Sequence, residues 1–179
     1  MDSIIDKMSN NLNPDNKKFS IIVAIDSING IGYNNELLCK IPEDLKRFKK
    51  LTLGNPIIMG KNTFLSLPNK KPLPERINIV ISSNSFFVGC ENVNSIEEAI
   101  DFAHPTKENF IIGGSSIYEQ FLPYIQKLYI TKINKEFHSD RFFPQFNIDK
   151  EWKLNSVLNQ KENHPEKLEY NFYEFERIN

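Results

Sequence analysis

Short and almost unbroken runs of apolar residues mark the buried strands that we expect. The first run, at 19–25 (FSIIVAI), is rich in β-branched side chains, and similar runs occur at 56–59, 77–82 and 110–112. Runs of this kind are typical of strands that are buried on both faces of a sheet. We therefore predict a central sheet built from these segments.

Segments with helical periodicity separate these runs. Pro42 opens one such segment, with two acids in its first turn. Its apolar side chains recur at every third position: Leu45, Phe48 and Leu51. Ser95, with Glu98 three residues later, predicts the start of another helix by the pattern of a capping box.

The alternation of strands and helices indicates a fold class. Parallel neighbouring strands need crossover connections, so the pattern favours an α/β fold with a mainly parallel sheet and helices on both faces. After Pro123 the pattern changes. Strand-like segments at 127–133, 152–158 and 168–178 follow one another with no helix predicted between them. We therefore expect the sheet to end in an antiparallel edge.

Composition sets the domain organisation and excludes several classes of function. Residues 1–18 are polar and aperiodic, which predicts a flexible polar extension before a single domain at 19–179. The 22 basic and 23 acidic residues almost cancel, so we expect no nucleic-acid partner. We find no membrane-spanning segment and no apolar signal sequence, and therefore expect a cytoplasmic protein. The scattered cysteines and histidines predict no metal site and no disulfide.

Gly113 and Gly114 lie where an apolar strand passes into a helix that we expect Ser115 or Ser116 to cap. Such a junction presents free backbone N–H groups and the positive end of a helix dipole. Glycine also lets a ligand approach the backbone without meeting a Cβ atom. The junction is a candidate anion site, and a tight turn with no ligand is the alternative interpretation.

A second junction of this kind lies at 60–63. Gly60 follows a strand, and a short helix is predicted from Asn62, with Lys61 and Thr63 beside its free N–H groups. Two such junctions favour a pyrophosphate-containing ligand between them, although each has the sequence of an ordinary helix start.

The positions of two charged residues do not by themselves reveal their roles. Asp44 lies in the first turn of the predicted helix, where an acid also complements the helix dipole. Arg76 precedes a strand, where an exposed arginine is ordinary. Spacing does not decide between these roles and a role in a site.

Taken together, the segments resemble dihydrofolate reductase from Phe19 to Ile178. The matching segments follow the family's order: VAID with Gly30-Ile31-Gly32, IPEDLKRFK, PIIMGKNTF, LPERINIVIS, IIGGSSIYEQFLP, LYITKI, DRFFP and YNFYEFERI. The resemblance implies a three-layer fold with a mostly parallel eight-stranded sheet, flanking helices and an antiparallel C-terminal strand. It also implies NADPH-dependent reduction of 7,8-dihydrofolate to tetrahydrofolate, by hydride transfer to C6 and protonation at N5, in support of one-carbon metabolism and thymidylate synthesis.

The resemblance implies roles for individual substrate-binding residues. Asp44 matches the family's active-site carboxylate, which hydrogen-bonds the pterin and promotes protonation at N5. Thr131 matches the threonine that supports this carboxylate, and Arg76 matches the arginine that pairs with the α-carboxylate of folate. The other implied substrate contacts are apolar: Ile22, Val23, Ala24, Leu45, Phe48, Leu67, Leu73 and Ile112.

For the cofactor, the resemblance implies contacts to each part of NADPH. Lys61 and the serines at 82–83 match contacts to the 2′-phosphate, Thr63 and the backbone at 114–117 match the pyrophosphate site, and Tyr118 adjoins the nicotinamide. The implied cofactor-binding residues are Ala24, Ile31, Gly32, Gly60, Lys61, Asn62, Thr63, Ser82, Ser83, Ile112, Gly113, Gly114, Ser115, Ser116, Ile117 and Tyr118. The peptide bond between the paired glycines is cis in this family.

The chain departs from the family at two places. Leu38-Cys39 stands where most relatives have Pro-Trp, whose tryptophan usually holds a water near the pterin carbonyl. Ser116 stands where some relatives have a basic residue for the 2′-phosphate.

Two other functions remain as alternatives. The pyrimidine reductase of riboflavin synthesis shares the fold and NADPH, but Asp44 together with Arg76 favours folate. The Leu38-Cys39 departure also suggests a catalytically inactive nucleotide-binding module, although Asp44, Thr131 and both candidate anion sites are retained. The expected partners are dihydrofolate and antifolates such as methotrexate, and we expect a monomer.

Overall fold

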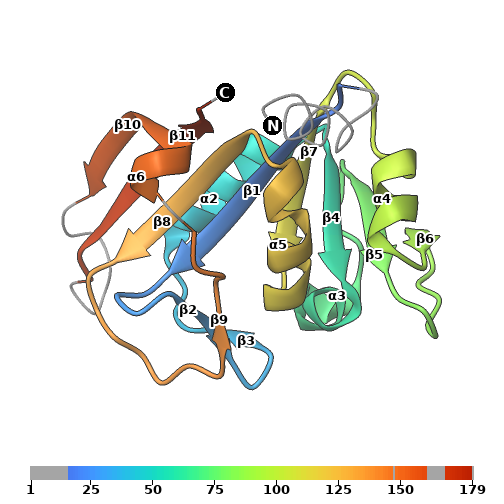
Figure 1. The fold of residues 1–179 in the computed structure, drawn as a ribbon. Helices are drawn as coiled ribbons and strands as arrows, with labels where there is room; N and C mark the ends of the chain where they lie inside the picture. The colour runs from blue at the N-terminus through green and yellow to red at the C-terminus, as the bar shows by residue number, and fades with distance from the viewer. Residues whose placement is uncertain (1–15, 147, 161–167, 179) are drawn as a thin grey trace.

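The computed structural model describes residues 16–146, 148–160 and 168–178, and its centre is one large twisted sheet (Figure 1). The strands of this sheet are β1 (Lys18–Ile25), β4 (Pro56–Gly60), β5 (Ile77–Ile81), β6 (Glu91–Val93), β7 (Glu108–Gly113), β8 (Lys127–Ile133), β10 (Trp152–Gln160) and β11 (Tyr170–Arg177). Their spatial order is β10-β11-β8-β1-β7-β4-β5-β6. Neighbours from β8 to β6 are parallel, whereas β11 is antiparallel to both β8 and β10. The predicted fold class is therefore confirmed.

Helices cover both faces of the sheet, so the fold has three layers (Figure 1). The helices are α2 (Pro42–Thr52), α3 (Lys61–Ser66), α4 (Ile96–Phe102), α5 (Ser115–Phe121) and α6 (Ile148–Glu151), with short 3₁₀ turns η1 (Pro68–Lys70) and η2 (Leu122–Tyr124). One core contains side chains of α4 and α5, and the core on the opposite face contains Phe48 of α2 and Phe64 of α3. None of the described helices is long and apolar enough to cross a membrane.

The unbroken apolar runs follow from this double coverage. Successive side chains of a strand point to opposite faces, so each strand must be apolar at every position when both faces are packed. On β4, Ile57 and Met59 belong to the core beneath α2 and α3, while Ile58 belongs to the core beneath α4 and α5. All three side chains are fully buried.

The long polar segment after β1 contains part of a second, smaller sheet. Its three strands are β3 (Glu36–Leu37), β2 (Gly30–Tyr33) and β9 (Arg141–Phe142). Asp26, which is fully buried, joins this sheet to the large one because its carboxylate accepts hydrogen bonds from the backbone N–H groups of Gly30 and Phe137 at 2.7 and 3.0 Å. A Cβ atom on Gly30 would lie only 2.2 Å from Oγ of Ser139, so the close approach requires glycine.

The structure corrects several predicted boundaries. Gly114 is the N-cap of α5 and supplies no side-chain cap, so the prediction that Ser115 or Ser116 caps this helix is wrong. Helix α3 begins at Lys61, one residue before the predicted start at Asn62. The one-turn helix α6 lies between β9 and β10, where no helix was predicted.

The predicted polar extension lies mostly outside the described residues. At its described end, Lys18 is already the first residue of β1. Lys17 is buried, and its Nζ donates hydrogen bonds to the carbonyl groups of Ile100 and Asp101 at 3.0 and 2.9 Å. These contacts tie residues 17 and 18 to the domain.

Candidate active site

The candidate site lies at the carboxyl ends of the parallel strands β1, β4, β5, β7 and β8. Helices α3 and α5 each begin directly where β4 and β7 end, and α2 passes beneath the neighbouring β1 and β8 (Figure 1). In open α/β sheets this edge is where loops and helix starts converge on ligands. The two glycine junctions and Asp44 therefore belong to one region of the molecule.

Asp44 lies in the first turn of α2, which begins after Ile41 with Pro42 in the favourable first position. Its Oδ1 accepts a hydrogen bond of 2.5 Å from the hydroxyl group of Thr131, a buried residue of β8. Thr131 is the register partner of Ala24 on β1. The structure thus brings together the predicted acid, its predicted supporting threonine and one predicted pocket residue.

The surroundings of Asp44 change its acidity. Burial raises the pKa of Asp44 because a carboxylate loses solvation there, while the hydrogen bond from Thr131 and the nearby Arg47 charge act in the opposite direction. Burial has the largest effect, so the carboxyl group binds a proton at a higher pH than an exposed aspartate does. Acids whose pKa is shifted by burial beside a cavity are candidates for functional sites.

A narrow cavity of about 30 Å³ lies against Asp44. Its other lining residues are Ala24, Ile31, Leu37, Leu38, Cys39, Ile41, Leu45 and Ile133. Ala24, Ile31 and Leu45 were predicted to lie at the site, and the Leu38-Cys39 departure proves to lie in its wall. Ile41 and Ile133 were not predicted to lie at the site, because their apolar side chains look like ordinary core residues in the sequence.

Most of the predicted apolar substrate contacts share one face of the sheet. Ile22 is buried in the core beneath α2 and α3. Four other predicted substrate contacts pack against this core: Phe48, Leu67, Leu73 and Ile112. Val23 is different, because its side chain points to the opposite face and packs with the α4 and α5 residues. Any contact of Val23 with the substrate would therefore involve its backbone, and the predicted contact stays a prediction.

Arg76 is held in a fixed orientation at the edge of this apolar wall. Its Nε donates to Oγ1 of Thr52 at 2.8 Å, and its Nη1 donates to the carbonyl group of Pro74 at 2.6 Å. The guanidinium carbon lies 5.9 Å from the centroid of the Phe48 ring. A guanidinium oriented in this way beside an aromatic wall can bind a carboxylate at the outer end of a ligand.

The two glycine junctions lie side by side. Met59 and Gly113 are register partners on β4 and β7, so the helix starts that follow them are adjacent. The Gly113-Gly114 peptide bond is cis, as the resemblance implied. Neither Gly60 nor Gly114 supplies a side-chain cap, which leaves the first-turn N–H groups of α3 and α5 without one.

Close packing favours glycine at position 60, and a positive φ of 116° favours it at position 113, whereas a side chain on Gly114 would make an ordinary contact. A Cβ atom on Gly60 would lie 3.0 Å from Cγ1 of Ile117, and one on Gly114 would lie 3.5 Å from Oγ1 of Thr63. The hydroxyl group of Thr63 therefore faces the paired-glycine junction. These contacts fit a pair of helix starts that both approach one anionic group.

A larger cavity of about 450 Å³ extends from these helix starts across β5 towards α4. It is lined by four predicted cofactor residues, Lys61, Ser82, Ser83 and Ile117, together with Ile81, Asn84, Asn94, Ser95, Ile96, Glu97 and Gln120. Ser95 was predicted only to cap a helix, since no local pattern in the sequence shows which strand end a helix start will face.

The polar groups of this region fit a phosphate-bearing dinucleotide. Lys61 contributes a cation, and its Nζ lies 3.4 Å from Oδ1 of Asn84. Oγ of Ser82 and Oγ of Ser115 are buried, and neither has a hydrogen-bond partner among the described residues. Buried hydroxyl groups usually find a partner, and Ser82, which lines the larger cavity, could find one in a ligand bound there.

Four other predicted cofactor residues do not line either cavity. The hydroxyl group of Tyr118 is buried and donates to the carbonyl group of Ile22 at 3.0 Å, which joins the two faces of the site. The carbonyl group of Gly32 accepts a hydrogen bond of 3.0 Å from the N–H group of Asp140. Asn62 and Ser116 lie at exposed helical positions and are not among the lining residues of either cavity.

Arg47 is a charged residue of the site that the sequence analysis missed. It follows Asp44 by three positions on α2, and its charge acts on the Asp44 carboxylate. The signal available in the sequence was this spacing, because residues three apart share a helix face.

Comparison with known proteins agrees with the geometry. The sequence model of the dihydrofolate reductase family matches residues 18–177. The dihydrofolate reductase of Bacillus subtilis is 41% identical over 162 residues, which cover 89% of this chain and 95% of that protein. The dihydrofolate reductase of Staphylococcus haemolyticus is 39% identical over 163 residues, which cover 90% of this chain and 96% of that protein.

A solved structure is similar over nearly the same length. The dihydrofolate reductase of Enterococcus faecalis, in complex with NADP(H) and RAB-propyl, superposes with a TM-score of 0.83 and 27% sequence identity. The match covers 90% of this chain and 97% of that one. The resemblance seen in the sequence is thereby confirmed. This chain belongs to the dihydrofolate reductase family, whose members are NADPH-dependent oxidoreductases.

Proposed function

We propose that this chain reduces 7,8-dihydrofolate to 5,6,7,8-tetrahydrofolate with NADPH, by hydride transfer to C6 and protonation at N5. The observation that supports this best is the position of Asp44. Its partly buried carboxyl group is held by the hydroxyl group of Thr131 and faces an apolar cavity. No other kind of chemistry is needed from the protein, because hydride transfer requires orientation and one proton.

Asp44 would orient the pterin ring and assist its protonation. As a carboxylate, it can accept hydrogen bonds from N3–H and the 2-amino group of the pterin. Because burial raises its pKa, it also exchanges a proton at a higher pH than an exposed aspartate would. We propose that this exchange promotes protonation at N5, through solvent and the pterin itself.

The apolar wall would hold the rest of the substrate. Phe48 would pack on the pterin and benzoyl rings, with Leu67 and Leu73 beside the benzoyl group. Arg76 would pair with the α-carboxylate of the glutamate, for which its orientation by Thr52 is suited. These apolar surfaces also exclude water from the reacting rings.

The neighbouring helix starts and the larger cavity would hold the cofactor. NADPH supplies the hydride when it is bound. Lys61, Ser82 and Ser83 would bind the 2′-phosphate, since they line the larger cavity together. The N–H groups at 114–117, with Thr63, would bind the pyrophosphate.

A spectrophotometric assay tests the proposal. Purified protein should oxidise NADPH, seen as a falling absorbance at 340 nm, only when dihydrofolate is added, and methotrexate should block the reaction. The control is the same mixture with the ribosylamino pyrimidine of riboflavin synthesis in place of dihydrofolate, which should give no change. A flat trace with dihydrofolate, or oxidation driven by the pyrimidine, would refute the proposal.

Three further features stay predictions. We propose a monomer in the cytoplasm whose product supports one-carbon metabolism and thymidylate synthesis. Sedimentation analysis of the purified chain tests the first of these.

A further inference from the structure

The guanidinium group of Arg47 is packed against the same face of the sheet that holds Asp44. We propose that Arg47 is a positioning residue that keeps Asp44 in the ionised form able to accept hydrogen bonds from the pterin. The consequence for catalysis rests on the proposed function. The effect of the Arg47 charge on the ionisation of Asp44 can be measured in the protein without ligands.

Two aromatic rings fix the place of the guanidinium group. Its central carbon lies 4.8 Å from the centroid of Phe172 and 5.5 Å from that of Tyr129. Phe172 is the direct register partner of Thr131, and directly opposed residues of an antiparallel pair share one face. Tyr129 lies two residues before Thr131 on β8, and therefore on the same face. The guanidinium group thus lies over the face of the sheet that carries Thr131, whose hydroxyl group holds Asp44.

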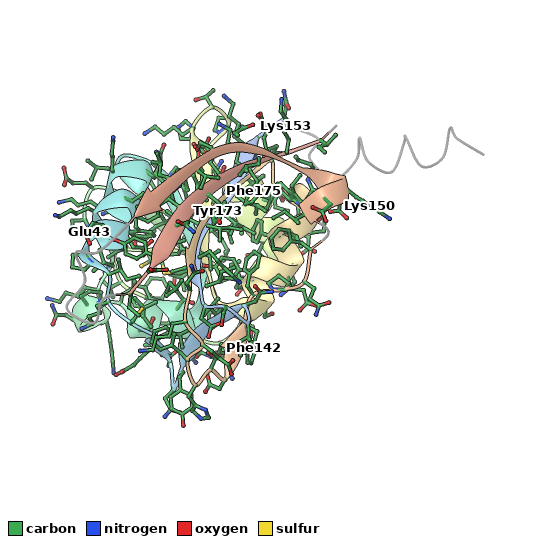
Figure 2. All side chains as sticks on the ribbon, turned by 90° about the vertical axis from the view of Figure 1, so that its left-hand side faces the viewer. Glu43, Phe142, Lys150, Lys153, Tyr173 and Phe175 are labelled. Atoms are coloured by element: carbon green, nitrogen blue, oxygen red, sulfur yellow. The ribbon has the colours of Figure 1, made fainter. Side chains whose placement is uncertain are left out.

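The side chains of β11 alternate between the two faces of the sheet, so only every second one can contact Arg47. Figure 2 shows the molecule from the side of β10 and β11, with Glu43 marking the start of α2 and with Tyr173 and Phe175 labelled on β11. Tyr173 and Phe175 pack with the core of α4 and α5, on the far face. The alternating residues Phe172 and Glu174 therefore face α2.

Hydrogen bonds only partly offset the cost of burying the Arg47 guanidinium group. Its Nη1 is buried and has no hydrogen-bond partner among the described residues. Burial lowers the pKa of Arg47, but an arginine keeps its proton at physiological pH. A buried charge is costly unless an opposite charge lies nearby. Asp44 is that charge, and its effect on Arg47 is larger than that of Glu174. Glu174 also lies 4.0 Å from Nζ of Lys127.

Other titratable groups near Asp44 do not replace this effect. They are Glu43 of α2, Tyr118 of α5, Tyr129 of β8, Tyr170 and Glu174 of β11, and Cys39 of the preceding segment. Burial raises the pKa of Tyr118 and of Tyr129, and raises that of Tyr170 to about 12, so all three tyrosines are neutral near pH 7. Glu43 and Glu174 are acids. Among the described titratable groups near Asp44, Arg47 is therefore the one whose charge favours the carboxylate.

The test measures the titration of Asp44 in the free protein. Aspartate labelled with ¹³C at the carboxyl carbon gives one NMR signal for each residue, and the signal lost in Asp44→Asn identifies Asp44. The variants are Arg47→Met, which removes the charge, and Arg47→Lys, which keeps it. Lys46→Met is the matched control, because it removes one charge from an exposed position of the same helix.

We expect Arg47→Met to shift the titration midpoint of Asp44 to higher pH, with Arg47→Lys close to the parent and Lys46→Met unchanged. In enzyme assays, Arg47→Met should shift the acidic limb of the plot of kcat/KM against pH to higher pH. A midpoint in Arg47→Met equal to that in Lys46→Met would overturn the proposal. If Arg47→Met is not properly folded, as shown by the absence of a cooperative unfolding transition, Arg47→Gln replaces it. Its Asp44 midpoint is then compared with that in Lys46→Met in the same way. The NMR result does not depend on turnover, so it stands apart from the assay at 340 nm.

Discussion

The hydroxyl group of Thr131 donates a hydrogen bond of 2.5 Å to Oδ1 of Asp44, across 87 positions of sequence. This contact joins β8 to the first turn of α2 and orients the carboxyl group towards the cavity. The carboxyl group is thereby held in one place while burial raises its pKa. Orientation and altered acidity are separate properties, and substitutions can measure each of them.

Asp44→Asn should lower kcat at pH 7 by about 10²- to 10⁴-fold, which is the usual contribution of a positioned acid or base. The amide cannot exchange a proton, but it retains an oxygen for the Thr131 hydroxyl group. Activity should recover in part below pH 6, where solvent supplies protons more readily. Steady-state rates across pH provide the measurement, and a parental rate at pH 7 would contradict the assigned role.

The same substitution should stabilise the free protein at neutral pH. A pKa raised on folding means that the folded state binds the proton more tightly than the unfolded state does. The stability contribution of Asp44 is therefore fully present below the unfolded pKa and is lost as pH rises through the raised folded value.

Thermal unfolding of Asp44→Asn tests this sign. Its Tm should exceed that of the parent at pH 7, by about 2–4 °C for each kcal/mol of relieved burial cost, and the difference should shrink in acid. Glu119→Gln, at an exposed position of α5, is the charge-matched control. Asp44→Asn also removes the charge opposite Arg47, so the decisive observation is the pH dependence: a Tm difference that stays constant as the pH falls would argue against a desolvated carboxylate.

Arg76→Leu should weaken binding of both dihydrofolate and methotrexate by about 10- to 150-fold. This range corresponds to the roughly 1.5–3 kcal/mol of a hydrogen bond to a charged group. Calorimetry with a pterin that lacks the glutamate should show little change, because that ligand never contacts the guanidinium group. Lys71→Leu, at a nearby exposed position, is the control. Equal Kd values for Arg76→Leu and the parent would remove Arg76 from the site.

Lys61→Met should raise KM for NADPH by about 10- to 150-fold and leave KM for NADH nearly unchanged, because only NADPH carries the 2′-phosphate. Lys61 lines the larger cavity with Ser82 and Ser83, so the loss of its charge removes the cation of that set. Lys49→Met, at an exposed position of α2, should have no effect on either cofactor. Equal loss for both cofactors would indicate a general effect on folding instead.

Local sequence determined the elements of this protein because strand and helix periods are local properties. The apolar run at 19–25 predicted β1, and Pro42 with its two following acids predicted the start of α2. The paired glycines likewise predicted a strand-to-helix junction, which lies between β7 and α5. The resemblance carried the functional assignment further than spacing alone, since Asp44 in a first helical turn has an ordinary structural role as well.

Tertiary structure decided which of these elements face one another. The contact of Arg47 with Phe172 depends on β11 lying beside β8, and the lining of the larger cavity by Ser95 depends on α4 beginning beside the end of β5. The face of the sheet on which the Val23 side chain lies follows from the register of β1. A run that is apolar at every position does not show in the sequence which residues lie on which face. Periodicity and capping residues act within a few positions of the chain, whereas burial, charge pairing and cavity shape arise between segments far apart in sequence, and these are the properties that set the chemistry of the site.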